Sequence, residues 1–195
     1  MEFFVVGADR VGTDLAHSLG ARSLNLADDL ADFISDRHPR AALVIVGSAL
    51  ATSTDSAALV ERILTTLPTS PIPRVILVSA FPDARRGQPV DPQFEKQTRA
   101  LKLLEVVVAA SELDWVVIRA GALRRTEGHG RVTAGPVIEH GSLSEDNLAA
   151  VVQEVTQRQD LVHAIVEVTD GPTPIADAID AIVALRTPFV REAVQ

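Results

Sequence analysis

The residues that could do chemistry begin at a glycine-containing turn near the start of the chain. An apolar run over residues 3–6 ends in Gly7, and Gly12 opens an amphipathic stretch. A turn of this kind between a buried strand and a helix directs backbone N–H groups and the positive end of the helix dipole toward a phosphate. The predicted cofactor-binding residues of this turn are Gly7, Ala8, Asp9, Arg10, Val11 and Gly12.

Asp9 departs from the dinucleotide-binding fingerprint, which has glycine at this position. That glycine lets a pyrophosphate approach the backbone, whereas Asp9 adds a Cβ and a negative charge. Unit charges about 4 Å apart in wet or partly buried surroundings repel by roughly 1–4 kcal/mol, and Arg10 could offset part of this. In the alternative interpretation Gly7 and Gly12 only make a tight turn, and Asp9 caps the helix. The sequence favours neither.

Basic residues gather after another apolar run, which spans residues 114–119. Arg119 ends the run, and Arg124 and Arg125 follow it. Ligands bind at the carboxyl ends of strands in open parallel sheets, and arginine recognises anions. These three arginines are the candidate substrate-binding residues, and surface salt bridging is the alternative.

His129 is the histidine that we single out for catalysis, as a general acid in the segment Glu127-Gly128-His129-Gly130. An exposed loop histidine is the alternative interpretation. None of the five histidines has the i, i+4 spacing of a helical metal site, and the chain has no cysteine. We therefore expect neither a metal site nor a disulfide.

Composition excludes several other classes of protein. Hydrophobic residues make up 47% of the 195 positions and charged residues 23%, which is typical of a globular chain. The net charge of −8 and the 4% of aromatic residues argue against nucleic acid as a partner. No apolar run has the length of a membrane span, and the first residues do not resemble a signal peptide. We expect a cytoplasmic protein that makes no membrane contact.

Short apolar runs alternate with amphipathic stretches, which is the pattern of βα units around a mostly parallel sheet. Strands are expected over 3–6, 22–26, 41–46, 74–79, 114–119 and 162–168, and helices over 11–19, 28–37, 56–67, 93–111, 144–157 and 175–185, the fifth of them capped by Ser144. Segment 121–141 is expected to be irregular, with a hairpin near 131–132, and to act as a mobile lid. Residues 1–195 are predicted to form one three-layer α/β domain of Rossmann type, with a sheet of five to six strands.

Residues 74–150 resemble the atypical short-chain dehydrogenases/reductases of the NAD(P)H-binding, NmrA-like group. The segments that carry the resemblance are V-I-L-V-S-A, R-A-L-K-L-L-E, L-D-W-V-V-I-R-A-G-A-L, G-R-V-T-A-G and L-S-E-D-N-L-A, in the order of the family. The resemblance implies a catalytic serine and lysine, here Ser79 and Lys102, and a cofactor that is NAD or NADP. Gly47 and Ser48, after the third strand, join the cofactor-binding candidates.

The chain departs from this family at the catalytic tyrosine. The superfamily pattern is Tyr-x-x-x-Lys, but Thr98 stands four residues before Lys102, and the chain contains no tyrosine. An alcohol cannot replace a phenol as general acid, because its pKa is far too high. Ser79 and Lys102 could still orient a carbonyl or a ribose, with His129 or solvent supplying the proton.

The chain is also shorter than the family between its first helix and its third strand. We expect one edge strand fewer and the strand order 2-1-3-4-5. The residues after the second strand include Asn25 and Asp28 but no arginine or lysine that could hold a 2′-phosphate. This favours NAD, held through Asn25 or Asp28, if a dinucleotide binds.

Two functions therefore stay open. One is hydride transfer between NAD(H) and a small carbonyl or quinone-like substrate, which Ser79, Lys102 and Arg119 favour. The other is a non-catalytic cofactor-sensing or cofactor-free regulatory or interaction protein on the same scaffold, which Asp9 and the missing tyrosine favour. The expected partners are a small-molecule substrate or nucleotide and a second copy of the chain, with the helix over 93–111 as the candidate dimer surface.

Overall fold

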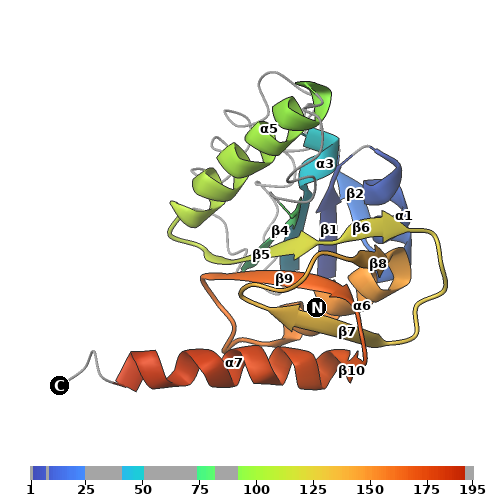
Figure 1. Ribbon diagram of the computed structural model, residues 1–195. Helices are drawn as coiled ribbons and strands as arrows, with labels where there is room; N and C mark the ends of the chain where they lie inside the picture. Colours follow the sequence, from blue (N-terminus) through green and yellow to red (C-terminus); the bar gives the residue numbers. More distant parts are fainter. Residues whose placement is uncertain (1, 8, 25–40, 51–73, 82–91, 192–195) are drawn as a thin grey trace.

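A computed structural model shows the architecture of the chain (Figure 1). It describes residues 2–7, 9–24, 41–50, 74–81 and 92–191. Ala8, Asn25 and the helices expected over 28–37 and 56–67 lie outside the described residues. Within the described ranges, no helix is both long enough and apolar enough to cross a membrane.

Six neighbouring parallel strands make up most of the sheet. In spatial order they are β2 (Arg22–Leu24), β1 (Glu2–Val6), β3 (Ala41–Val46), β4 (Arg74–Ala80), β5 (Asp114–Ala120) and β9 (Ala164–Asp170). The expected order 2-1-3-4-5 is confirmed. Val5, Val44, Ile76 and Val116 lie in register across four of these strands, and all four are fully buried. The strands read as continuous apolar runs because helices cover both faces.

Two short antiparallel strands, β7 (Arg131–Gly135) and β10 (Thr173–Pro174), extend this sheet to eight strands. A separate parallel pair joins β6 (Ala122–Arg124) to β8 (Ser142–Ser144). We expected segment 121–141 to be irregular, but it contains β6 and β7. The expected hairpin is also wrong, since β7 pairs with β9 and β10, where it satisfies the open edge of β9. Movement of this segment as a lid stays a prediction.

Helices cover the sheet on both faces, which gives the expected three layers (Figure 1). On one face lie α1 (Arg10–Leu19), α6 (Glu145–Gln157) and α7 (Ile175–Arg191), and on the other α3 (Gly47–Leu50) and α5 (Pro92–Ala109). The core is split accordingly into two apolar clusters. Leu15, Leu148 and Ile179 belong to the first, and Leu104 and Val108 of α5 to the second.

Local signals account for the helix ends. Ser144 caps α6 as expected, since its side chain accepts a hydrogen bond from Asn147 N at 3.0 Å. Gly20 ends α1 in the left-handed conformation, with φ of 59°. On α5, Leu103 and Val106 are exposed. The expected homodimer through this helix stays a prediction.

Candidate functional site

The candidate site lies at the edge of the sheet where the parallel strands have their carboxyl ends. Asp9 follows β1 and Ser48 follows β3, and these two strands are neighbours. The chain runs from β1 outward to β2 on one side and to β3 on the other, so the strand order reverses between them. A crevice forms at such a reversal and binds ligands in open α/β sheets.

The predicted glycines set the backbone of this crevice. Gly7 has a φ of 153°, which a residue with a Cβ rarely adopts. A Cβ on Gly12 would lie 2.8 Å from the carbonyl carbon of Gly7, so only glycine lets α1 start this close to β1. A Cβ on Gly47 would lie 2.6 Å from Leu101 Cδ2, which ties Gly47 to the packing of α5. Val11 is partly buried and packs against the apolar core.

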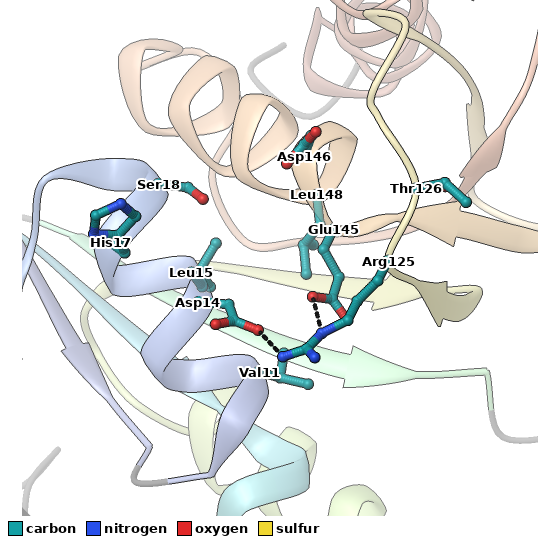
Figure 2. Close-up of a pocket in the computed structure, with 10 residues that line it drawn as sticks. All are labelled: Val11, Asp14, Leu15, His17, Ser18, Arg125, Thr126, Glu145, Asp146 and Leu148. Carbon is teal, nitrogen blue, oxygen red and sulfur yellow. Dashed lines mark hydrogen bonds and ion pairs between the residues drawn. The ribbon is translucent and has the colours of Figure 1, made fainter.

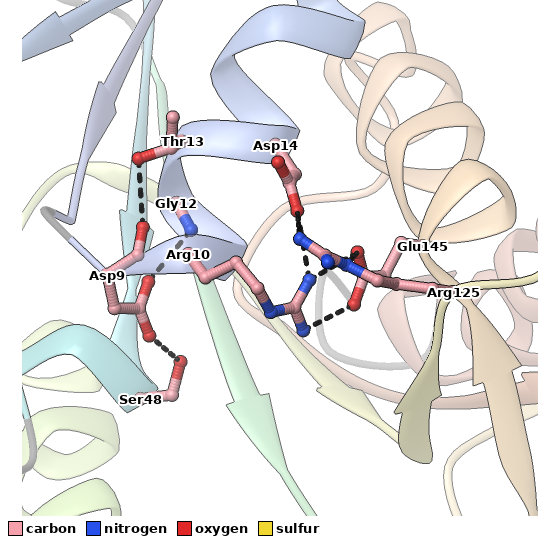
Figure 3. Close-up of polar contacts among 8 residues, drawn as sticks. All are labelled: Asp9, Arg10, Gly12, Thr13, Asp14, Ser48, Arg125 and Glu145. Atoms are coloured by element: carbon pink, nitrogen blue, oxygen red, sulfur yellow. Dashed lines mark hydrogen bonds and ion pairs between the residues drawn. The ribbon is translucent and has the colours of Figure 1, made fainter.

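Asp9 caps α1 with one oxygen of its carboxylate and binds Ser48 of α3 with the other (Figure 3). Gly12 N donates to Oδ1 at 2.8 Å, and the Ser48 hydroxyl donates to Oδ2 at 3.0 Å. Asp9 is therefore a helix cap, and cofactor binding by the residues of this turn stays a prediction. The carboxylate lies at the amino end of α1, the place where a helix of this fold binds a phosphate.

Arg10 does not offset the charge of Asp9, contrary to the expectation from the sequence. Its guanidinium turns to α6 and donates to the two oxygens of Glu145 at 2.6 and 2.8 Å (Figure 3). A third hydrogen bond, of 2.9 Å, reaches Asp14 Oδ2. These bonds, first of all those to Glu145, raise the pKa of Arg10 above its usual value. The cause is a carboxylate 135 positions away in the sequence, which no local pattern reveals.

Arg125 belongs to the same ionic cluster. It donates to Asp14 Oδ2 at 3.0 Å, and its Nε lies 4.0 Å from Glu145 (Figure 2). The hydrogen bond from Arg125 is the main cause that lowers the pKa of Asp14. Arg125 lines a cavity of about 330 Å³ between α1 and α6, together with these two carboxylates. Arg125 therefore forms the salt bridges of the alternative interpretation.

Arg119 is also committed to carboxylates. Its guanidinium forms a two-pronged pair with Glu105 of α5, at 3.1 Å from Nε and 2.7 Å from Nη2, and its Nη1 lies 3.5 Å from Glu167 of β9. Hydrogen bonding to Glu105 is the main cause that raises its pKa. Arg124 is exposed on β6. Carboxylates from other elements thus pair with two of the three arginines, and substrate binding by Arg119, Arg124 and Arg125 stays a prediction.

Ser79 is joined to Glu105 of α5, and Glu105 lines a cavity that Lys102 lines as well. The Ser79 hydroxyl donates to Glu105 Oε1 at 2.7 Å, and both side chains are buried. Glu105 follows Lys102 by three residues and therefore lies on the same face of α5. We did not predict Glu105 as a site residue. The signal was available, since a glutamate at this place is part of the R-A-L-K-L-L-E segment.

A cavity of about 170 Å³ opens beside this group. Its lining comes from α3, from the end of β4 and from α5, and consists of Ser48, Ala80, Phe81, Phe94, Gln97, Thr98, Leu101, Lys102 and Glu105. Thr98 and Lys102 face the same cavity, as the four-residue spacing predicts. Among the described residues that line the cavity, Lys102 is the only basic one. The cavity thus presents an ammonium group, a threonine hydroxyl and a buried carboxylate to a small molecule.

His129 is not among the residues that line this cavity. The N–H groups of its neighbours Gly128 and Gly130 donate to Asp146 and Asn147, which holds this loop at the start of α6. His140 is closer to the cavity, since its ring packs edge-on against Phe81, with 4.9 Å between centroids. Sequence reasoning did not single out His140. No local signal marks it, because its contact with Phe81 depends on the tertiary fold.

Comparisons with known proteins agree with this geometry. A family model of NAD(P)H-binding proteins matches residues 19–159. A UPF0659 protein of Schizosaccharomyces pombe is 24% identical over 178 residues, which cover 80% of this chain and 72% of that protein. An uncharacterized sugar epimerase of Bacillus subtilis is 33% identical over 111 residues, which cover 55% of this chain and 50% of that protein.

Solved structures share the fold. An oxidoreductase from Lactococcus lactis superposes with a TM-score of 0.73 at 16% identity, covering 94% of this chain and 97% of its own. An anaerobilin reductase from Escherichia coli O157:H7 gives a TM-score of 0.70 at 16% identity, and the alignment covers 89% of this chain and 100% of that protein. A short-chain dehydrogenase/reductase from Veillonella parvula, solved in complex with NADP, gives 0.65 at 13% identity, with coverages of 88% and 95%. At such identities the likeness shows the fold alone.

Proposed function

The chain belongs to the family of NAD(P)H-binding proteins, and from this premise we propose that it is a reductase of small carbonyl or quinone-like substrates. The observation that carries the proposal is the cavity at the carboxyl ends of β3 and β4, where Thr98, Lys102 and Glu105 of α5 meet. This is the edge of a parallel sheet at which ligands bind. The family match supports a nicotinamide dinucleotide as the cofactor.

The crevice beside the cavity fits such a dinucleotide on one condition. Gly7 and Gly12 give the tight turn that the fold uses to present the amino end of α1 to a pyrophosphate. Ser48, which borders the cavity, would add a hydroxyl donor to the phosphates. The condition is that the Asp9 carboxylate moves aside, since it takes the hydrogen bonds of Gly12 N and Ser48.

The nicotinamide ring, when bound, supplies the hydride that reduces the carbonyl carbon of the substrate. Lys102 donates a hydrogen bond to the carbonyl oxygen and stabilises the negative charge that develops there. The proton that completes the alcohol reaches this oxygen from the Lys102 ammonium or from water. Thr98 stands where the superfamily has its acidic tyrosine and takes no part in this proton transfer. Ser79 and Arg119 act indirectly, by holding Glu105 in the wall of the cavity.

We favour NAD(H) over NADP(H) as the cofactor. The residues after β2 include Asn25, Asp28 and Asp29 but no lysine or arginine before Arg37. An acidic residue at that place binds the ribose hydroxyls of NAD, whereas a 2′-phosphate needs a basic one.

A second function is favoured by a different observation. The Asp9 carboxylate on α1, together with the absence of tyrosine from the chain, suits a protein that senses a nucleotide without reducing anything, or one that binds none. Calorimetric titration with NAD⁺, NADH, NADP⁺ and NADPH separates these functions. A micromolar dissociation constant for NADH, followed by turnover of a carbonyl or quinone, supports the reductase. Absence of binding at millimolar ligand supports the nucleotide-free protein.

Lys102 gives the sharpest test of the reductase. We expect Lys102→Ala to lower kcat/KM for the best carbonyl of a substrate panel by about a hundredfold, because one preorganised hydrogen-bond donor is lost. The matched control is Lys96→Ala, which removes the same charge from an exposed position of α5. The rate is followed by the absorbance of the reduced nicotinamide. Equal rates in the two variants would remove Lys102 from the mechanism.

A further inference from the structure

The amino end of α1 binds a carboxylate of the chain itself. Asp9 accepts from Gly12 N with one oxygen and from the Ser48 hydroxyl with the other (Figure 3). Gly12 N belongs to the first turn of α1, and Ser48 follows the neighbouring strand β3. A phosphate at this crevice would need the same two donors, because they point to the place where the helix dipole is positive.

We propose that Asp9 is a built-in competitor for the phosphate site of the cofactor, and thereby sets how strongly the chain binds a dinucleotide. The proposal rests on the proposed function, since it concerns the same crevice. The Asp9 carboxylate imitates a phosphate, and a dinucleotide binds only after the Asp9 side chain has rotated away. Gly12 N and Ser48 then donate to the pyrophosphate.

The surrounding charges keep Asp9 effective as a competitor. Arg10, the adjacent cation, is held by Glu145 and Asp14 and points away from Asp9. The helix end and one hydroxyl are therefore the partners of Asp9 that the described residues provide. A pyrophosphate that approaches this end meets a negative charge, so repulsion adds to the loss of the two hydrogen bonds.

The side chain of Asp9 can leave without unwinding α1. The backbone carbonyl of Asp9 is held separately, because the N–H and the hydroxyl of Thr13 each donate to it at 3.0 Å. The first turn thus keeps these two hydrogen bonds when the carboxylate moves. For the same reason a variant that lacks the carboxylate is expected to fold, since replacing a capping residue by glycine costs little.

The first experiment compares Asp9→Gly with the natural chain. Dissociation constants are measured by calorimetry for NADH and for inorganic pyrophosphate, which probes the phosphate site alone. We expect Asp9→Gly to bind both ligands about tenfold to a hundredfold more tightly. Thermal melting without ligand verifies that the variant is folded.

Two further variants separate charge from competition for donors. Asp9→Asn removes the charge but keeps an oxygen that can accept from Gly12 N, so an affinity between those of the natural chain and Asp9→Gly is expected. Asp177→Asn is the matched control, because it removes the same charge from the first turn of α7. The affinity of the control should stay within about twofold of the natural value, since Asp177 is an exposed residue on another helix.

Substitution of Ser48 tests whether its hydroxyl exchanges Asp9 for the pyrophosphate as its hydrogen-bond acceptor. In the Asp9→Gly background, Ser48→Ala should weaken pyrophosphate binding about fivefold, because a donor to the phosphate is lost. In the natural chain, the same change should leave binding unchanged or tighten it, since Ser48 there stabilises the competitor. Equal effects in the two backgrounds would contradict the exchange of partners.

The outcomes for the inference and for the proposed function are distinct. Tight binding by Asp9→Gly with weak binding by the natural chain supports both. Binding by Asp9→Gly alone supports the inference and overturns the reductase. Equal, measurable binding by the two chains supports a nucleotide-binding protein and overturns the inference. If neither chain binds NADH or pyrophosphate, both proposals are wrong.

Discussion

Arg119 pairs with two buried carboxylates, those of Glu105 and Glu167. Arg119 joins the two carboxylates, and Ser79 donates the hydrogen of its hydroxyl to Glu105. Glu167 in turn accepts from Ile138 N at 3.0 Å, which fixes the turn after β7. Of the cavity-lining residues that the structure describes, Lys102 is the one cation.

Arg119→Met tests this arrangement. The change leaves Glu105 and Glu167 buried without their cation, and we expect a loss of about 3 kcal/mol in the free energy of unfolding. Urea denaturation measures it. Arg158→Met is the matched control, because the arginine side chains are 21% and 22% exposed. Their carboxylate partners differ in exposure. The side chains of Glu105 and Glu167, which pair with Arg119, are each 9% exposed. Those of Asp160 and Asp180, which pair with Arg158, are 51% and 61% exposed.

The control should lose about 1 kcal/mol or less, as exposed ion pairs do. If both variants lose the same amount, then burial of the carboxylates does not determine the strength of the network around Arg119.

At the scale of the element, α1 shows how the position of a glycine decides its importance. Gly12 and Gly20 lie at opposite ends of the same helix. At Gly12 the backbone of β1 is so close that a Cβ has no room, whereas at Gly20 nothing lies within 4 Å of the added atom. Gly20 is needed only for its φ of 59°.

Alanine at each end of α1 should therefore have different effects. We expect Gly20→Ala to cost about 1 kcal/mol, because a residue with a Cβ is strained in the left-handed region. Gly12→Ala should cost several times more, since its Cβ would overlap the Gly7 backbone and push α1 from the sheet. Thermal unfolding of the two variants gives the comparison. A smaller loss at Gly12 than at Gly20 would mean that the turn after β1 is looser than described.

At the scale of the whole molecule, ion pairs join parts of the fold that are distant in the sequence. Arg10 of α1 pairs with Asp14 of the same helix and with Glu145 of α6 (Figure 3). Arg125, which follows β6, also pairs with Asp14 (Figure 2). A second exposed cluster joins Arg158, after α6, to Asp180 of α7. Both clusters depend on ionised carboxylates, in a chain with a net charge of −8.

Stability should therefore fall in acid. The pKa of Asp14 is lowered in the folded chain mainly by Arg125, and that of Asp160 mainly by Arg158, from an ordinary value of 3.8. A lowered folded-state pKa gives stabilisation that is complete above the unfolded value and is lost as the pH falls through the folded value. We expect a nearly constant Tm from pH 7 to about 5 and a steep fall below about pH 4.

Asp14→Asn provides the check on this assignment. The variant should have a lower Tm than the natural chain at pH 7. The difference should shrink as the pH falls below the ordinary value of 3.8 and through the lowered folded-state pKa, because Asp14 of the natural chain then takes up a proton. Differential scanning calorimetry over this range measures both curves. A difference in Tm that does not change with pH would show that ionisation of Asp14 is not the cause.

The sequence by itself determined the scaffold. It predicted the strand over 41–46, the order of the first five strands, the cap at Ser144 and the placement of Thr98 and Lys102 on one face. These features could be predicted because hydrophobic period, capping and helical spacing are local properties of the chain. Local reasoning also reached Asp9 as a helix cap, although only as one of two interpretations.

Only the tertiary structure decided what each charged group does. Glu145 binds Arg10 from 135 positions away, and Glu167 reaches Arg119 from 48 positions away. It was likewise the fold that brought His140, and not His129, to Phe81 beside the cavity. The physical reason is that a charge takes the partner that lies within a few ångströms in space, and sequence distance does not limit that choice.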